Sequence, residues 1–242
     1  MGRRTITRRR GRGGPRYQVP SFRFEGGVNY PQGQKYAKGI GGQVISIDND
    51  PARTAPVAKI LLEDFSEIRL VASEGMKVGQ WVAIGGEAKQ EKGNVLQLGN
   101  ISEGTLVYNI ELTPGDGGKI VRASGGAAAI ISHDKEKGIT VVKLPSKKTA
   151  EIPSKSLASI GIVAGGGRKE KPMVRAGQNY HRHKARNKLY PRVRGVAMNA
   201  QNHPHGGGSH GYTGRPSSVA RNTPPGRKVG MIAPSRTGRR KR

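Results

Sequence analysis

Three of the six histidines in this chain lie in one glycine-rich segment, Arg192 to Gly211. Imidazole titrates near neutral pH, so His203, His205 and His210 could transfer protons, ligate a metal or contact RNA. The three successive glycines Gly206, Gly207 and Gly208 allow positive φ and close approach to another surface. The segment has almost no apolar periodicity, which predicts that a partner gives it its shape.

Acid–base catalysis is one hypothesis for His203. A catalytic imidazole usually works with an orienting carboxylate or a nucleophile. The sequence offers no carboxylate near His203, no cysteine and no G-x-S-x-G turn. These absences favour His203 as an RNA contact and predict that the chain is not an enzyme.

A zinc site is the second hypothesis, built from the three loop histidines or from His181 and His183. Zinc sites favour defined spacing on rigid elements, whereas these histidines lie on a glycine-rich loop and in a basic segment. We therefore expect no metal ligands and no cofactor. Mg²⁺ shared between the phosphates of a bound RNA and backbone carbonyls is the one metal we consider plausible.

The charge of the chain points to a polyanionic partner. There are 43 Lys and Arg against 16 Asp and Glu, a net charge of +27. The net charge is +8 over residues 1–35, −2 over 36–110, +3 over 111–164 and +18 over 165–242. This distribution predicts a near-neutral folded centre between two basic extensions. A DNA-compacting protein or a generic RNA chaperone is an alternative that charge alone allows.

Composition also bears on location. No apolar run approaches the roughly 20 residues of a membrane span, and the basic N-terminus lacks the apolar core of a secretory signal. Without cysteine, the chain has neither disulfides nor a cysteine-based zinc site. We therefore expect a cytoplasmic protein with no membrane partner.

The centre of the chain reads as short strands separated by tight turns, a mainly β pattern. A first group suits a five-stranded OB-fold-like barrel. Its expected strands are 42–48, 57–63, 67–71, 80–85, 95–98 and 105–110. A second group suits an SH3-like barrel. Its expected strands are 119–123, 128–132, 139–144, 149–153 and 159–163. Trp81 is expected in the first core.

The flanking segments are expected to bind RNA. Arginines of the N-terminal arm can contact phosphates, and its aromatic residues Tyr17, Phe22, Phe24 and Tyr30 can stack on bases. A nuclear-import signal and a disordered tail are the competing interpretations of the arm. A short basic helix is expected over 174–188, ending before Pro191. The predicted domains are a basic RNA-binding arm (1–35), an OB-like barrel (36–107), an SH3-like barrel with the basic helix (108–190) and a basic glycine-rich extension (191–242).

The predicted RNA contacts are cations, loop histidines, one amide and the three glycines. In the arm they are Arg3, Arg4, Arg8, Arg9, Arg10 and Arg12. From residue 165 they are Arg168, Lys169, Lys171, Arg175, His181, Arg182, Lys184, Arg186, Arg192, Arg194, Asn199, His203, His205, Gly206, Gly207, Gly208, Arg221, Arg227, Lys228, Arg236, Arg239 and Arg240.

A series of motifs, in order along most of the chain, resembles one family. The motifs are D-P-A-R-T-A-P-V-A (50–58), P-G-D-G-G (114–118), V-V-K-L-P-S (141–146), G-G-G-R-x-x-K-P (165–172), V-R-G-V-A-M-N (193–199), N-H-P-H-G-G-G (202–208) and P-G-R-K-V-G (225–230). They resemble the universal large-subunit ribosomal protein "L two" family. The first motif and the short I-A-x-x-R-T-G-R tail resemble its archaeal and eukaryotic branch.

The resemblance implies an OB-fold domain, an SH3-like domain and extensions buried in large-subunit rRNA. It implies a ribosomal protein that binds rRNA and other ribosomal proteins, and contacts tRNA and the small subunit indirectly. The implied roles are subunit association, tRNA binding and support of the peptidyl-transferase region. One departure is Asn202, where the family usually has an acidic residue before H-P-H-G-G-G. A neutral amide would raise the pKa of His203 less than a carboxylate would, which weakens a direct chemical role.

Overall fold

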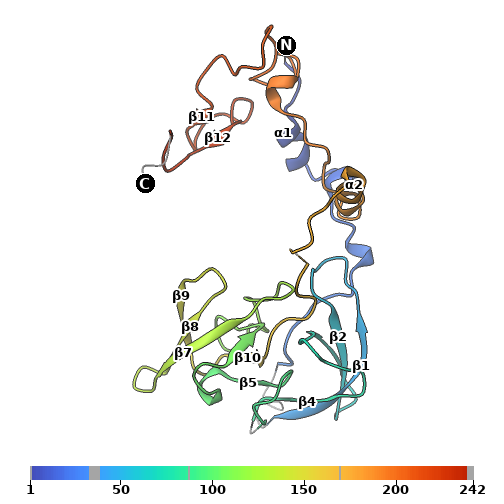
Figure 1. Cartoon of the computed structure of the whole chain (residues 1–242), viewed down its shortest axis with the longest axis vertical. Coiled ribbons are helices and arrows are strands. Elements are labelled where there is room, and N and C mark those ends of the chain that lie inside the picture. Colours follow the sequence, from blue (N-terminus) through green and yellow to red (C-terminus); the bar gives the residue numbers. More distant parts are fainter. Residues whose placement is uncertain (1, 33–38, 87, 169, 239–242) are drawn as a thin grey trace. The chain divides into compact units, whose positions relative to one another are not determined.

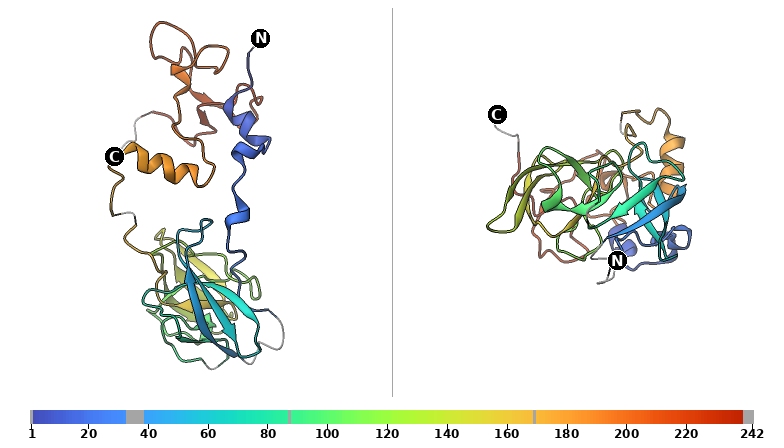
Figure 2. Two further views of the ribbon diagram at one scale, coloured as in Figure 1. Left: turned by 90° about the vertical axis from the view of Figure 1, so that its right-hand side faces the viewer. Right: turned by 90° about the horizontal axis from the view of Figure 1, so that it is seen from below.

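The chain divides into two units in the computed structural model, which describes residues 2–32, 39–86, 88–168 and 170–238. One unit is Ser21–Pro172, called here the β unit. The other, called the basic unit, combines the N-terminal residues up to Pro20 with the C-terminal residues from Met173 (Figures 1 and 2). Contacts thus place the two ends of the chain in one unit. From the sequence, the N-terminal arm and the C-terminal extension were predicted as separate domains.

The β unit contains one mixed sheet. Its strands are β1 (Ile40–Asp48), β2 (Val57–Leu62), β3 (Glu67–Val71), β4 (Trp81–Ile84), β5 (Val95–Gln97), β6 (Leu106–Tyr108), β7 (Ala128–Asp134), β8 (Ile139–Lys143), β9 (Thr149–Pro153) and β10 (Leu157–Ile160). They pair in the order β3-β2-β1-β4-β5-β10-β6-β7-β8-β9, antiparallel except for β4 with β5. The short 3₁₀ turn η2 (Ser21–Arg23) precedes β1, and a second one, η4 (Leu98–Asn100), directly follows β5.

Each half of the sheet carries a long bulged hairpin. The β1–β2 register shifts between Val44 and Ser46, and the β7–β8 register shifts between Ile130 and Ser132. An extra residue bends the strand and increases its twist, so each half can curve over its own core. Figure 1 shows the β7–β9 hairpins at one end of the unit and β1, β2 and β4 at the other.

Each half has an apolar core, and a third cluster joins them. The first core is built around Val44, Ile60 and Val82, and the second around Val107, Ile130 and Val142. The third brings Val57 and Val71 of the first half together with Tyr108 and Val163 of the second. This arrangement agrees with the expected mainly β fold of an OB-like unit followed by an SH3-like unit. Over the described ranges, however, the strand pairing runs from β3 to β9 without closing into a barrel.

Two buried tyrosines connect segments that are distant in sequence. The Tyr30 hydroxyl donates to the carbonyl of Asn109 at 2.7 Å and lies 2.8 Å from Ser159 Oγ. The Tyr108 hydroxyl donates to the carbonyl of Val71 at 3.2 Å. Burial raises the pKa of both phenols, so both stay neutral and act as structural donors.

Two expectations about aromatic residues were wrong. Tyr30 was expected to stack on RNA bases from the arm, but it is 2% exposed and packs in the first core. Trp81 was expected in that core, but it is 56% exposed. The indole lies over Gly41, because strand alternation directs Val82 and Ile84 inward and Trp81 to the other face.

Two expected strands also differ. The segment 119–123 forms only an isolated bridge between Ile110 and Ile120, because Val121 has a left-handed φ of 56° that interrupts extended backbone. The last strand was expected over 159–163 but runs from Leu157 to Ile160, and Gly161 follows it at φ 115°.

The basic unit has little regular structure. It contains α1 (Ile6–Gly11), the 3₁₀ turns η1 (Pro15–Tyr17) and η5 (Gly195–Ala197), α2 (Ala176–Lys184), and the parallel pair β11 (Ser218–Val219) and β12 (Met231–Ile232). The helix expected over 174–188 is therefore present but shorter. No helix in the described part of the chain is long and apolar enough to cross a membrane.

Candidate nucleic-acid interface

The His203 imidazole lies directly on Gly195. A Cβ on Gly195 would come much closer to the ring than van der Waals contact allows. This glycine therefore provides the space that the histidine occupies, and it joins the motif 193–199 to the motif 202–208.

Gly206 makes a second contact between the same two motifs. A Cβ there would collide with the carbonyl oxygens of Met198 and Asn199. The Gly207 amide also donates to the Met198 carbonyl at 2.9 Å. Gly206 is thus required for packing within the chain.

His205 joins the third motif, 225–230, to the other two. His205 is 9% exposed, and its ring carbon Cε1 would lie 3.2 Å from a Cβ on Gly230. Gly230 has φ 86° and also lies against the carbonyl of Ser217. We call residues 193–199, 202–208 and 225–230 together the motif cluster.

The motif cluster changes the interpretation of the histidine segment. The segment was expected to take its shape from a partner, and Gly206 to lie against RNA. In the structure the segment packs against its own chain through Gly195, Gly206 and Gly230, and the RNA contact of Gly206 stays a prediction. Gly207 and Gly208 are exposed, although the Gly207 N–H is already engaged by the Met198 carbonyl.

Local hydrogen bonding fixes the His203 ring. The backbone N–H of His205 donates to His203 Nδ1 at 3.0 Å, which makes Nδ1 an acceptor and leaves the ring proton on Nε2. The two imidazole centroids are 5.0 Å apart at an interplanar angle of 63°. Burial, and then the neighbouring His205, lower the pKa of His203 below its usual value, so the ring is neutral at pH 7.

The N-terminal arm packs beside the motif cluster within the basic unit (Figure 2). The Arg3 N–H donates to the carbonyl of Gln201 at 2.7 Å. Further along, the Asn187 amide donates to the carbonyl of Gln18 at 2.8 Å. The two ends of the chain are thus tied at two places.

Two pockets lie against His203, and Thr5 lines both. The first, of about 270 Å³, is lined by Arg3, Arg4, Arg8 and Asn202. The second, of about 450 Å³, is lined by Arg10, Arg192 and Arg194, with Met198 at its wall. Each pocket therefore combines arginines of the arm with residues of the C-terminal segment.

The electrostatics of the basic unit favour an anionic ligand. Residues 1–20 and 173–242 contain 23 Lys and Arg and no Asp or Glu. Within this unit no carboxylate side chain can neutralise the arginines. The remaining 152 residues hold all 16 acidic side chains of the protein.

The structure exposes most of the predicted RNA contacts. Those exposed in the basic unit are Arg3, Arg4, Arg8, Arg9, Arg10, Arg12, Arg175, His181, Arg182, Lys184, Arg192, Arg194, Asn199, Gly207, Gly208, Arg221, Arg227 and Arg236. Arg186, His203, Gly206 and Lys228 are half-buried, and His205 is buried.

Two predicted contacts belong to the β unit. Arg168 and Lys171 are exposed there, and Arg168 Nε donates to Ser124 Oγ at 3.1 Å. Lys169, Arg239 and Arg240 lie outside the described residues.

Several residues of this surface were missed from the sequence. Thr5 is 5% exposed, and its hydroxyl has no hydrogen-bond partner in the described structure. Arg16 and Lys188 line a third basic pocket beside Tyr17 and Tyr180. Arg16 and Lys188 could have been predicted from their positive charge, whereas nothing in the sequence distinguishes Thr5 from other threonines.

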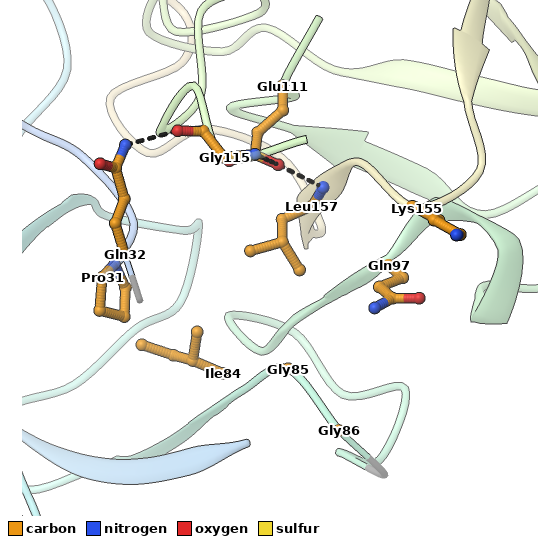
Figure 3. A pocket seen from close by; sticks show the side chains of 10 residues that line it. All are labelled: Pro31, Gln32, Ile84, Gly85, Gly86, Gln97, Glu111, Gly115, Lys155 and Leu157. Carbon is orange, nitrogen blue, oxygen red and sulfur yellow. Dashed lines mark hydrogen bonds between the residues drawn. The ribbon is translucent and has the colours of Figure 1, made fainter. Parts of the chain in front are cut away.

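One pocket of the β unit is lined by a buried carboxylate whose role is structural. It encloses about 360 Å³, with Pro31 and Gln32 on one side and Gln97 and Lys155 on the other (Figure 3). The Glu111 carboxylate at its wall is 1% exposed. It accepts backbone N–H bonds from Gly115, Gly117 and Leu157 at 3.2, 2.9 and 2.8 Å. These bonds hold the 114–118 turn against β10.

A metal site is not visible in the described structure, where no three His, Asp or Glu side chains lie close enough together to hold an ion. The Asn202 N–H donates to the Asn199 carbonyl at 2.9 Å, and among the described residues no side-chain hydrogen bond joins Asn202 to His203. The arrangement therefore offers cations and a neutral, fixed imidazole, which suit contact with RNA phosphates and hydroxyls.

The comparisons with known protein families and with individual relatives point to the same family. Residues 5–84 match the family described as Ribosomal Proteins L2, RNA binding N-terminal domain, and residues 91–228 match Ribosomal Proteins L2, C-terminal domain. Large ribosomal subunit protein uL2 of Hyperthermus butylicus is 50% identical over 242 residues, covering 100% of both chains. The uL2 proteins of Methanococcus maripaludis and Halorubrum lacusprofundi are 50% and 48% identical, covering 99% of this chain and 100% and 98% of their own lengths.

Proposed function

Because the chain belongs to the L2 family of ribosomal proteins, we propose that it is a structural component of the large ribosomal subunit that binds rRNA through its basic unit. The observation that carries this proposal is the joining of both chain ends into one unit with 23 cations and no acidic side chain. Phosphate contacts by such cations supply affinity and fix the position of a protein on folded RNA.

The β unit carries a much smaller net charge than the basic unit. Its 20 Lys and Arg nearly balance its 16 Asp and Glu, so its surface also suits contact with other ribosomal proteins. Subunit association, tRNA binding and support of the peptidyl-transferase region belong to this proposal as indirect effects. They would follow from ordering rRNA that contacts tRNA and the small subunit. The ribosome of the cytoplasm is the proposed location.

A salt titration tests the binding function. The full chain should bind transcripts of large-subunit rRNA more tightly than random duplex DNA of equal length, at matched ionic strength. Affinity should fall steeply with salt because each phosphate contact releases counterions. Equal affinity for both nucleic acids would contradict the proposal and favour a generic polyanion-binding protein.

A non-enzymatic role follows for His203. Its Nδ1 accepts a backbone N–H bond, and no hydrogen bond from a carboxylate reaches the ring in the described part of the chain. General acid–base groups contribute roughly 10²- to 10⁴-fold to rate. Large subunits assembled with His203→Ala should therefore lose less than about 10²-fold in peptidyl transfer. A larger loss in particles of normal composition would restore the catalytic hypothesis.

Magnesium remains part of the proposal only as a shared ion. With no acidic side chain in the basic unit, Mg²⁺ there would be held by rRNA phosphates, with backbone carbonyls as the protein ligands.

A further inference from the structure

The two His203 pockets share one wall, formed by Thr5 and His203. Both residues line both pockets, and the arginines divide between them. Arg8 of the arm lies on one side, and Arg194 of the C-terminal segment lies on the other. A ligand that fills both pockets would therefore contact both ends of the chain.

Thr5 provides an independent indication of a ligand. It precedes α1 but makes no side-chain capping bond, and its buried Oγ1 has no partner in the described structure. Leaving a buried hydroxyl unpaired is unfavourable. An oxygen or hydroxyl of a ligand seated at this wall would satisfy it.

The chemistry of both pockets selects phosphate. Arginine guanidinium groups match phosphate oxygens with paired hydrogen bonds, and this unit has no acidic side chain to compete for them. The neutral His203 adds no repelling or attracting charge, but its Nε2–H can donate to a phosphate or a ribose hydroxyl.

Resting on the proposed rRNA binding, we propose that the N-terminal arm and the motif cluster form one composite site, in which two backbone phosphates of folded RNA bind on opposite sides of the Thr5–His203 wall. The arm is then half of the binding site of the C-terminal loop. Neither end of the chain alone provides the complete site.

Charge-removing variants of the full chain test the composite site. Arg8→Gln and Arg194→Gln each remove one cation, from one pocket each. Each should reduce the slope of log affinity against log salt by about 1, and the pair by about 2. Lys135→Gln is the matched control, because it removes one exposed cation on the β7–β8 turn of the β unit. It should leave the slope unchanged.

A hydroxyl-removing variant tests the shared wall separately from charge. Thr5→Val keeps the shape of the side chain but lacks the hydroxyl. It should weaken rRNA binding by roughly 2- to 10-fold without changing the salt slope. Thr5→Ser should restore the affinity. If Val and Ser variants bind RNA equally well, no ligand meets this hydroxyl and the shared wall is wrong.

Inorganic phosphate distinguishes RNA from a free anion as the ligand. At matched ionic strength, inorganic phosphate should compete with RNA only weakly, because separate ions lack the covalent link that joins two backbone phosphates. Saturable competition at phosphate concentrations equal to those of the RNA phosphates would show that the link contributes nothing and would overturn the composite site.

The outcomes separate the two proposals. If the wild-type chain does not prefer rRNA, the proposed function fails. If it does, but Arg8→Gln and Arg194→Gln behave like Lys135→Gln, rRNA binding stands and the composite site fails.

Discussion

The imidazole of His203 occupies the space that a side chain at position 195 would need. A Cβ on Gly195 would overlap the ring, and the His205 N–H holds Nδ1 of the same ring at 3.0 Å. Position 195 therefore needs a glycine, because the His203 ring occupies the space that a side chain there would fill. The same ring, together with Thr5, lines two arginine-lined pockets.

Gly195→Ala should displace the His203 ring. Overpacking of this kind typically costs about 1–3 kcal/mol, here within the motif cluster. The measurement is the chemical shift of the His203 ring protons together with rRNA affinity, both of which should change. Gly177→Ala in α2 is the control, because nothing lies within 4 Å of a Cβ at that position. An unchanged His203 signal in Gly195→Ala would contradict the observed contact.

The pKa of His203 predicts a pH dependence with a definite sign. Burial lowers this pKa in the folded chain, so protonation favours the unfolded or opened state. Its contribution to stability is therefore fully present above about pH 6.5 and is lost as the pH falls through the lowered value. An NMR titration of the free protein should give a midpoint below 6.5 for His203. A midpoint above 6.5 would contradict the burial of this ring.

Glu111→Gln should destabilise the β unit. The carboxylate accepts three backbone N–H bonds, whereas a carboxamide has a single acceptor oxygen and a donor group facing those N–H groups. With about 1.5–3 kcal/mol for a hydrogen bond to a charged group, we expect a loss of about 3 kcal/mol in unfolding free energy. Urea denaturation followed by circular dichroism would measure it. Glu136→Gln, on the exposed β7–β8 turn, should change stability by less than about 0.5 kcal/mol.

Trp81 should behave as a surface residue. It is the only tryptophan in the chain, so its fluorescence reports this position alone. With 56% of the side chain exposed, the free protein should show red-shifted emission that iodide quenches readily. Blue-shifted emission resistant to iodide would instead place the indole in the core.

The sequence predicted local structure where a short pattern determines it. Runs of β-branched and apolar residues between turn signals located β1, β2, β3 and β9 to within about two residues, and charge distribution predicted basic extensions around a β centre. The prediction was wrong at Val121 and Trp81. Val121 has the β-branched character of a strand residue but a left-handed φ. Trp81 was expected in the core, but it lies on the opposite face of β4 from the buried Val82.

The site was predicted in composition but not in arrangement. Exposed arginines and the histidine loop were recognised because charge and residue type are visible in a sequence. The packing of Arg3 against Gln201, 198 positions apart in the chain, has no local signal. Nor does the unpaired hydroxyl of Thr5, because it arises only after the two ends of the chain meet.

A crosslinking map of rRNA in assembled large subunits tests the central claim most directly. The account predicts that crosslinks concentrate in residues 2–20 and 173–238, and that Arg8 and Arg194 crosslink to the same RNA segment or to segments in direct contact. Crosslinks concentrated in residues 39–168, or Arg8 and Arg194 on RNA segments remote from each other in the folded subunit, would contradict it.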